Sequence, residues 1–245
     1  MTEPNSTFPG ADVQSESPAP AAERARAKHA KTLGEEIANA ITHGIGSALA
    51  IAALAVLIAY GALADSAWAI VGSAIYGATL IVTYVSSTLY HSLLPGKPKR
   101  VFLALDHCGI FFLIAGTYTP VALIGLHGAW TTTVLAVVWS GAALAALTKV
   151  CWVGAPKWLS AALGIALGWV AVVALPELAH NEGLAPLFLL AAGGLAYTAG
   201  AVVYASGRPD PLPRVFGYHE LFHALTIIAL SCQYVAIAVF IVRVT

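Results

Sequence analysis

Seven long apolar stretches dominate the chain and limit the folds available to it. They lie at about residues 39–63, 67–93, 101–126, 129–150, 157–176, 184–205 and 217–242. Each is close to the ~20 residues that an α-helix needs to cross the apolar core of a bilayer. Because lipid offers the backbone no hydrogen-bond partners, this pattern predicts an all-α membrane protein, built as a seven-transmembrane helix bundle.

The composition supports a membrane location and argues against a nucleic-acid partner. Only 10% of the residues are charged and 59% are hydrophobic, whereas about 25% are charged in a typical soluble domain. Lys+Arg and Asp+Glu balance at 12 each, and no basic stripe is interleaved with aromatic residues, so we expect no nucleic-acid binding. Membrane lipids are the expected partners. The three cysteines (Cys108, Cys151 and Cys232) are scattered and predict reduced thiols.

The positive charges predict the orientation of the bundle. With seven spans and a cytoplasmic N-terminus, every Lys and Arg except Arg243 falls in a cytoplasmic segment, as the positive-inside rule requires. We therefore expect a multi-pass protein of the cell (plasma) membrane with its C-terminus outside. Residues 1–33 are rich in Pro, Ala, Ser and charge and predict a disordered cytoplasmic tail. Residues 34–245 form the predicted transmembrane domain.

Four ionisable residues lie inside the apolar stretches at a similar depth, about 3–10 Å from the cytoplasmic boundary. They are His91, Asp106, His219 and His223. Such residues are costly in a membrane and usually have a function there. His219 and His223 are four residues apart, so they share one helix face. Three imidazoles suit zinc and leave a fourth position for water, which is the pattern of catalytic zinc sites.

Other readings of these polar residues stay open. The histidines could instead form a proton relay or a buried polar lock between helices. A second group of polar residues lies at the start of the first span and comprises Glu35, Glu36, Asn39 and His43. We expect these residues to support the site or the start of the helix rather than to bind metal directly. On a helix His107 points about 100° away from Asp106, so we expect it to face another helix. Glu220, next to His219, likewise need not share the site.

The segments SSTLYHS, LDHCGIFFLIAGTYTP and FGYHELFHAL, together with ANAITHGIG in the first span, resemble the signature segments of the hemolysin III family. This family is the bacterial branch of the progestin and adipoQ receptor superfamily, and the resemblance covers about residues 33–243. It implies a seven-helix bundle with a cytoplasmic N-terminus and a zinc ion near the cytoplasmic face. Matched motif by motif, it implies that His91, His219 and His223 bind zinc. Asp106 would hold the zinc-bound water, and Ser87 completes the Ser-x3-His motif.

The resemblance favours a zinc-dependent membrane hydrolase, because the related receptors are associated with ceramidase-like activity. In that reading the substrate is an amide or ester lipid, Asp106 is the general base and then acid, and Ser87 hydrogen-bonds the oxyanion. One alternative is a non-enzymatic membrane-homeostasis or sensor protein with structural zinc. Another is a membrane-lytic, hemolysin-like protein. Hormone binding is not expected, since this chain has only a short N-terminal tail.

Overall fold

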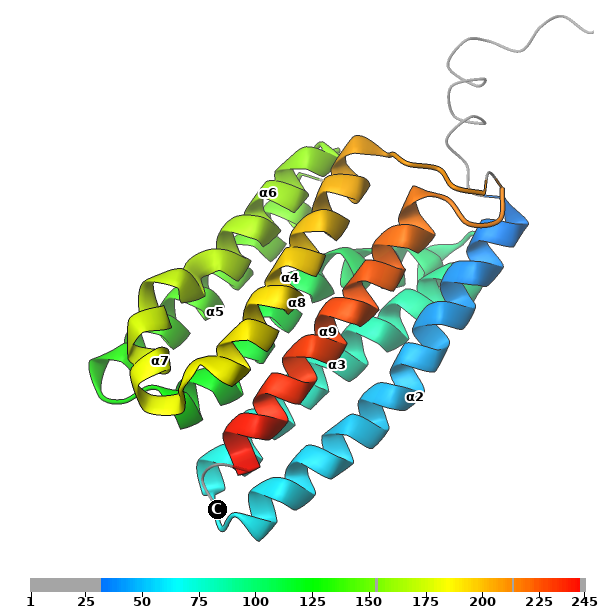
Figure 1. Cartoon of the computed structure of the whole chain (residues 1–245). Helices are drawn as coiled ribbons and strands as arrows, with labels where there is room; N and C mark the ends of the chain where they lie inside the picture. The colour runs from blue at the N-terminus through cyan, green and yellow to red at the C-terminus, as the bar shows by residue number, and fades with distance from the viewer. Residues whose placement is uncertain (1–31, 153, 213, 243–245) are drawn as a thin grey trace, which may run out of the picture. The chain divides into compact units, whose positions relative to one another are not determined.

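In the computed structural model the chain folds into long α-helices that run alongside one another (Figure 1). The structure describes residues 32–152, 154–212 and 214–242. Nearly all of the predicted tail (1–33) lies outside these residues, so its disorder stays a prediction. The elements are α2 (Leu33–Leu63), α3 (Ala67–Ser92), α4 (Lys97–Gly125), α5 (Ala129–Cys151), α6 (Lys157–Gly168), η1 (Trp169–Ala174), α7 (Leu175–Glu182), α8 (Leu184–Ser206) and α9 (Tyr218–Val242).

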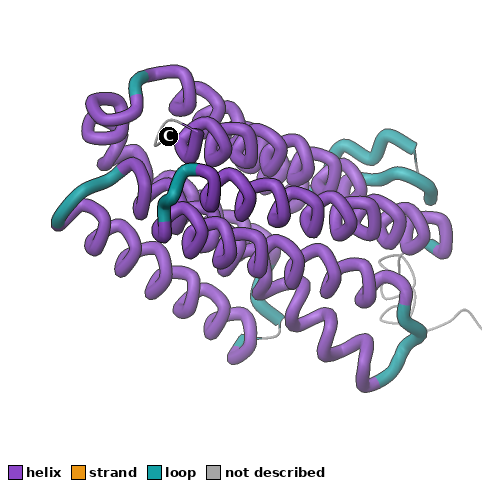
Figure 2. The backbone as a smooth tube through the Cα atoms, turned by 90° about the horizontal axis from the view of Figure 1, so that it is seen from below, coloured by secondary structure: helices purple, strands orange, loops and turns teal. Residues whose placement is uncertain are grey.

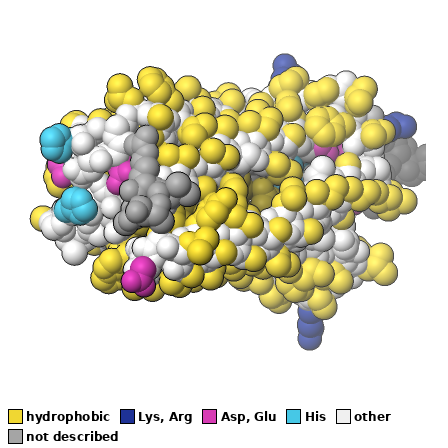
Figure 3. All heavy atoms as spheres, turned by 60° about the horizontal axis from the view of Figure 1, so that its bottom comes forward, with side chains coloured by type: hydrophobic (Ala, Val, Ile, Leu, Met, Phe, Trp, Pro, Cys, Tyr) yellow, Lys and Arg dark blue, Asp and Glu magenta, His cyan; other side chains and the backbone are white. Residues whose placement is uncertain are grey.

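Seven segments of the described chain are helical, long enough and apolar enough to cross a bilayer. Six are single helices, and the fifth, Lys157–Glu182, combines α6, η1 and α7. Figure 2 shows a backbone that is helical almost throughout, with short connecting loops. Figure 3 shows hydrophobic side chains over the flank of the bundle and Lys and Arg toward one end. The predicted all-α, seven-helix fold is therefore confirmed.

Helix α2 begins earlier than the hydropathy pattern predicts, because Thr32 caps it. The Thr32 hydroxyl accepts a hydrogen bond from the Glu35 backbone at 3.3 Å, and the Glu35 carboxylate accepts one from the Thr32 backbone at 2.7 Å. This reciprocal pair is a capping box. Glu36 and Asn39 are consequently on the helix rather than in a segment that leads into it, and their side chains have fixed directions.

The fifth span differs from the prediction. The sequence analysis ended this span at about residue 176, but Glu177, His180 and Glu182 continue it on helix α7. Proline is tolerated in the first turn of a helix, where its missing N–H has no partner to lose, and Pro176 occupies that turn. The helix therefore continues past the proline that the sequence analysis took as its end.

Between α6 and α7 the chain tightens into the 3-10 segment η1. The Tyr118 side chain, from α4, satisfies the backbone there: its hydroxyl donates to the Gly168 carbonyl at 2.6 Å and accepts from the Ala171 N–H at 2.8 Å. Irregular backbone at membrane depth needs such partners, because lipid supplies none.

Close helix contacts depend on glycine at two positions. A Cβ atom on Gly193 of α8 would lie 2.9 Å from the Ala229 carbonyl oxygen of α9. On α3, a Cβ atom at Gly72 would lie 2.7 Å from the Pro120 Cα atom of α4. Small residues of this kind let membrane helices approach closely. Helix α9 packs against α2 on one side and α8 on the other, and the start of α9 thereby meets the start of α2.

Candidate metal centre

The three histidines predicted as ligands meet at one end of the bundle. His91 lies in the last turn of α3, and His219 and His223 lie in the first two turns of α9. One ligand nitrogen from each lies within 4.8 Å of the other two. Two nitrogens bound to one tetrahedral zinc at about 2.0–2.1 Å are roughly 3.4 Å apart. Small side-chain rotations would therefore close the group around one ion.

The rings of the three histidines face a common centre from two helices. The ring centroids of His219 and His223 are 4.5 Å apart, and the His91 centroid is 5.5 and 5.6 Å from theirs. His91 and His223 are buried. His219 is partly exposed as a residue, although its Nε2 atom is buried. The predicted convergence of these residues from separate spans is what the structure shows.

Glu36 connects the histidine cluster to helix α2. Its Oε2 atom lies 2.5 Å from Nδ1 of His91, and its Oε1 atom accepts a hydrogen bond from Lys99 Nζ at 3.1 Å. A carboxylate in this position makes Nδ1 the protonated nitrogen of His91. Nε2 is then the nitrogen that His91 can offer to a metal ion. Glu36 thus contacts one of the three histidines and lies outside the group whose ligand atoms converge, while its expected support of a metal ligand stays a prediction.

Glu220 has a different role, because it anchors the helix that carries two of the histidines. Its side chain is buried and accepts hydrogen bonds from the Asn39 side chain of α2 and from the Gly217 backbone, the latter at 2.7 Å. The buried carboxylate thus ties the start of α9 to α2. Glu220 is not one of the residues whose ligand atoms converge, in line with the expectation that it need not share the site.

His43 packs directly against one of the three histidines. Its ring stacks on His223 with a centroid separation of 3.6 Å and an interplanar angle of 11°. The Tyr84 ring approaches the His43 ring edge-on, with a centroid separation of 4.9 Å. His43 is buried and lies outside the converging group. The stacking brings His43 directly onto His223, while its expected role in supporting the site stays a prediction.

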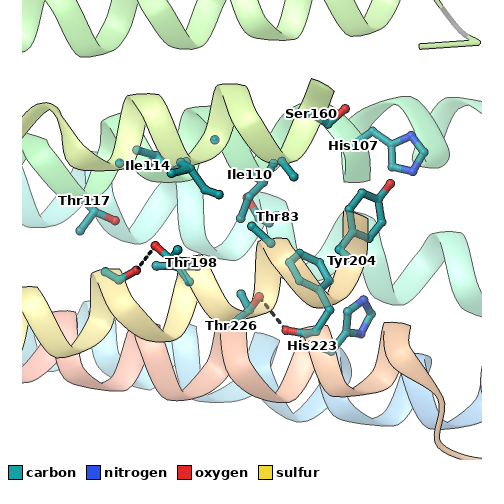
Figure 4. A pocket seen from close by; sticks show the side chains of 18 of the residues that line it. Thr83, His107, Ile110, Ile114, Thr117, Ser160, Thr198, Tyr204, His223 and Thr226 are labelled. Carbon is teal, nitrogen blue, oxygen red and sulfur yellow. Dashed lines mark hydrogen bonds between the residues drawn. The ribbon is translucent and has the colours of Figure 1, made fainter. Parts of the chain in front are cut away.

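A cavity of about 150 Å³ extends from the histidines into the bundle. His43, His219 and His223 line it from one side, and Asp106 of α4 lines it as well. Figure 4 shows His223, Tyr204 and His107 at one end of this cavity and Thr117 and Thr198 toward the other. Most of the wall between them is apolar, so the cavity suits the chain of a lipid better than a polar solute.

Asp106 borders the cavity but is outside the group whose ligand atoms converge. Its carboxylate makes no hydrogen bond or ion pair with the described part of the chain. His107 was expected to face another helix, yet it lines the same cavity as Asp106. The cavity is bordered by α5 and α6 in addition to α4, so neighbouring residues of α4 both reach it. Ser87 is fully buried one turn before His91, and its Oγ atom has no hydrogen-bond partner among the described residues.

The sequence analysis missed several residues at this cavity. Lys149 near the end of α5 and Ser160 of α6 line it, as do Tyr197 and Tyr204 of α8 and Gln233 of α9. Lys149 carried a usable signal, since it is an ionisable residue at the end of an apolar stretch. Gln233 carried a signal too, as the one glutamine in the seven apolar stretches, whereas the tyrosines carried none, because only the packing shows which of them face the cavity.

Comparisons with known proteins match this chain over most of its length. The family described as "Haemolysin-III related" matches residues 31–234. The hemolysin-3 homolog of Bacillus subtilis (strain 168) is 36% identical over 213 residues, which are 87% of this chain and 97% of that protein. Hemolysin-3 of Bacillus cereus is 41% identical over 170 residues, 69% of this chain and 78% of its own. A heptahelical transmembrane protein (ADIPOR2) of Oryza sativa subsp. japonica is 33% identical over 160 residues, 58% of this chain and 69% of its own.

Proposed function

Because the chain belongs to the haemolysin-III-related family of multi-pass membrane proteins, we propose that it is a zinc-dependent hydrolase of amide or ester bonds in membrane lipids. One observation carries the proposal: three histidines converge within 4.8 Å beside a cavity that Asp106 also lines. The donor set fits zinc, since three imidazoles are a common ligand set for catalytic zinc.

The residues would divide the work as follows. His91, His219 and His223 would hold the ion, which when bound supplies a Lewis acid and makes hydroxide available near neutral pH. In the reaction a water oxygen adds to the carbonyl carbon of the lipid, and the bond to the nitrogen or oxygen of the leaving group breaks. Asp106 would take the proton from the attacking water and return it to the leaving amine or alcohol. Ser87 would donate a hydrogen bond to the developing oxyanion.

The place of Asp106 supports this assignment. Its carboxylate borders the cavity beside His219 and His223 without a hydrogen bond or ion pair to the described residues. A base must be able to reach the water that it deprotonates, and this carboxylate lies on the wall of the cavity. The apolar wall of the cavity would receive the lipid chain directly from the bilayer.

A structural role for zinc is the second candidate, favoured by the contact between Glu36 and His91. Through this contact the histidine cluster joins α2, α3 and α9, so a bound ion would hold three helix ends together. The two candidates differ in a simple test. In a hydrolase, Asp106→Asn removes turnover and leaves zinc bound. With purely structural zinc, His223→Ala lowers thermal stability and the native protein cleaves no lipid.

The experiment begins with elemental analysis of the purified full chain beside a variant in which His91, His219 and His223 are all alanine. We expect about one zinc per native chain and none in the variant. Native protein and Asp106→Asn would then be incubated in nanodiscs with N-acylsphingosine and with phosphatidylcholine, and the products would be measured by mass spectrometry. Metal-free native protein would refute the zinc site, and zinc-loaded protein without any lipid product would refute the hydrolase.

We also infer that the histidine end of the bundle faces the cytoplasm of a cell whose plasma membrane holds the protein. Lys99 and Lys157 lie at the starts of α4 and α6, at this end, and positive residues favour the cytoplasmic side. Cys151, at the end of α5, is exposed there. With the other two cysteines replaced, an impermeant maleimide should label Cys151 in inverted vesicles and not in intact cells. The reverse labelling would overturn the orientation.

A further inference from the structure

The far end of the cavity contains polar atoms that neither the zinc site nor the proposed reaction uses. Tyr197 of α8 and Gln233 of α9 both line the cavity. The Tyr197 hydroxyl and the Gln233 Oε1 atom are buried, and neither has a hydrogen-bond partner among the described residues. Two further atoms share this condition nearby on α3, the Tyr76 hydroxyl and the Ser73 hydroxyl.

Gln233 lies well away from the histidines, and Tyr197 lies on α8 between Gly193, which packs against Gln233, and Gly200, which packs against Phe222. Gln233 is ten residues beyond His223 on α9, which corresponds to about 15 Å along a helix axis. The Gln233 side chain lies against α8 at Gly193, where its Cγ atom would be 2.9 Å from an added Cβ. Tyr197 is one turn from Gly193 on the same helix. Figure 4 shows Thr117 and Thr198 at this end of the cavity, opposite the end at which His223 lies.

Leaving these atoms unpaired would be costly. A buried polar group without a partner destabilises the fold, and a membrane-spanning bundle has no bulk water close by. Other hydroxyls on the cavity wall are already bonded to the backbone: Thr117 donates to the Leu113 carbonyl and Thr226 to the Phe222 carbonyl. Tyr197 and Gln233 thus stand out, because they combine a place on the cavity wall with unused hydrogen-bonding capacity.

We propose that Tyr197 and Gln233 form a second binding subsite, which takes a neutral oxygen group carried on the chain of the bound lipid. The subsite rests on the proposed function, since it assumes that the lipid chain extends from the histidines along the cavity. Tyr197 can donate a hydrogen bond and Gln233 can accept one, so a hydroxyl group on the chain satisfies both residues. The preferred substrates are then lipids with an oxygenated chain rather than a plain hydrocarbon chain.

The test compares two probes that differ by one hydroxyl, 12-hydroxyoctadecanoic acid and octadecanoic acid. In an extended chain the hydroxyl of the first lies at a distance from the carboxyl group comparable to that between Gln233 and His223. Binding of each acid to the zinc-loaded full chain would be measured by calorimetry in detergent. We expect the hydroxy acid to bind about fivefold more tightly, the ratio that one net hydrogen bond of about 1 kcal/mol produces.

Variants show whether the preference comes from this subsite. The double change Tyr197→Phe and Gln233→Leu should remove the preference and leave the affinity for octadecanoic acid unchanged. Thr226→Val is the matched control, since it deletes a cavity hydroxyl that is already bonded to the backbone, and it should keep the preference. Equal binding of the two acids by native protein, or a preference that survives the double change, would overturn the subsite.

The same samples separate this proposal from the hydrolase proposal. Zinc content is measured for each variant and should stay at one ion per chain, because neither changed residue is near the three histidines in the sequence. Loss of the preference with zinc retained therefore reports on the far subsite alone. If waters filled the subsite, both acids would bind native protein equally, and that result also overturns the proposal.

Discussion

Glu36→Gln tests how the bundle prepares His91 for a metal ion. The native carboxylate lies 2.5 Å from His91 Nδ1 and therefore holds the proton on that nitrogen. Glutamine keeps an oxygen that can accept this hydrogen bond, but it loses the negative charge and the ion pair with Lys99. Removing a partner of this kind usually lowers metal affinity by about 10- to 100-fold, or roughly 1.4–2.7 kcal/mol.

Because the hydrogen bond is partly retained, we expect Glu36→Gln to weaken zinc binding by about tenfold, at the lower end of that range. Glu36→Ala, which removes the hydrogen bond as well, should approach the upper end. The zinc dissociation constant would be measured in detergent by competition with a chromophoric chelator. The ¹⁵N resonances of His91 would report in parallel whether the proton leaves Nδ1.

Glu35→Gln is the matched control, since Glu35 is the neighbouring acid and forms the capping box with Thr32 rather than contacting His91. This variant can keep the capping-box hydrogen bond, which glutamine also accepts, and should leave zinc affinity within twofold of native. A Glu36→Gln protein that binds zinc as tightly as native protein would refute the argument. So would equal losses of zinc affinity in the two variants, because a general weakening of α2 would then explain both.

Three further perturbations test the packing and the metal site. Tyr118→Phe should destabilise the protein by about 1–3 kcal/mol, because the Ala171 N–H loses its hydrogen-bond partner. The measurement is the melting temperature in detergent, and an unchanged value would contradict this role of Tyr118. Gly72→Ala should prevent normal folding, since its Cβ would lie 2.7 Å from Pro120 Cα. Gly168→Ala is the control, because an added Cβ there meets nothing within 4 Å. Size-exclusion profiles compare the two variants, and matching profiles would refute the contact at Gly72. Chelation of zinc should lower the free energy of unfolding of native protein by about 2.7 kcal/mol, if free zinc was at 100 times its dissociation constant before chelation. The measurement is the melting temperature, which should fall. An unchanged melting temperature after chelation would argue against bound zinc.

The spacing of polar residues within each apolar stretch was enough to nominate the histidines. The interval between His219 and His223 places both on one face of a helix whatever the rest of the fold does. His91 could be nominated because an imidazole near a membrane boundary is costly without a use. The number and direction of the spans place the end of α3 and the start of α9 at the same side of the membrane, but the approach of all three histidines to within 4.8 Å depends on how the helices pack.

Helix boundaries show where sequence patterns were weaker. Hydropathy placed the start of the first span several residues late, because Glu35 and Glu36 lower the local average although they are helical. Pro176 was taken as a helix end, while the structure uses it in the first turn of α7. Composition does not distinguish a proline that ends a helix from one that begins it, since the outcome depends on the position of the proline in the turn.

The sequence by itself determined the seven-helix class and the common depth of the three histidines, because helical periodicity and membrane thickness act on each segment separately. Only the tertiary structure decided which neighbours those residues have. The contact of Glu36 with His91 joins residues 55 positions apart, and Asp106, Tyr197 and Gln233 come from three helices to line one cavity. Such contacts depend on helix rotation and tilt, which side-chain packing sets and which no local pattern encodes.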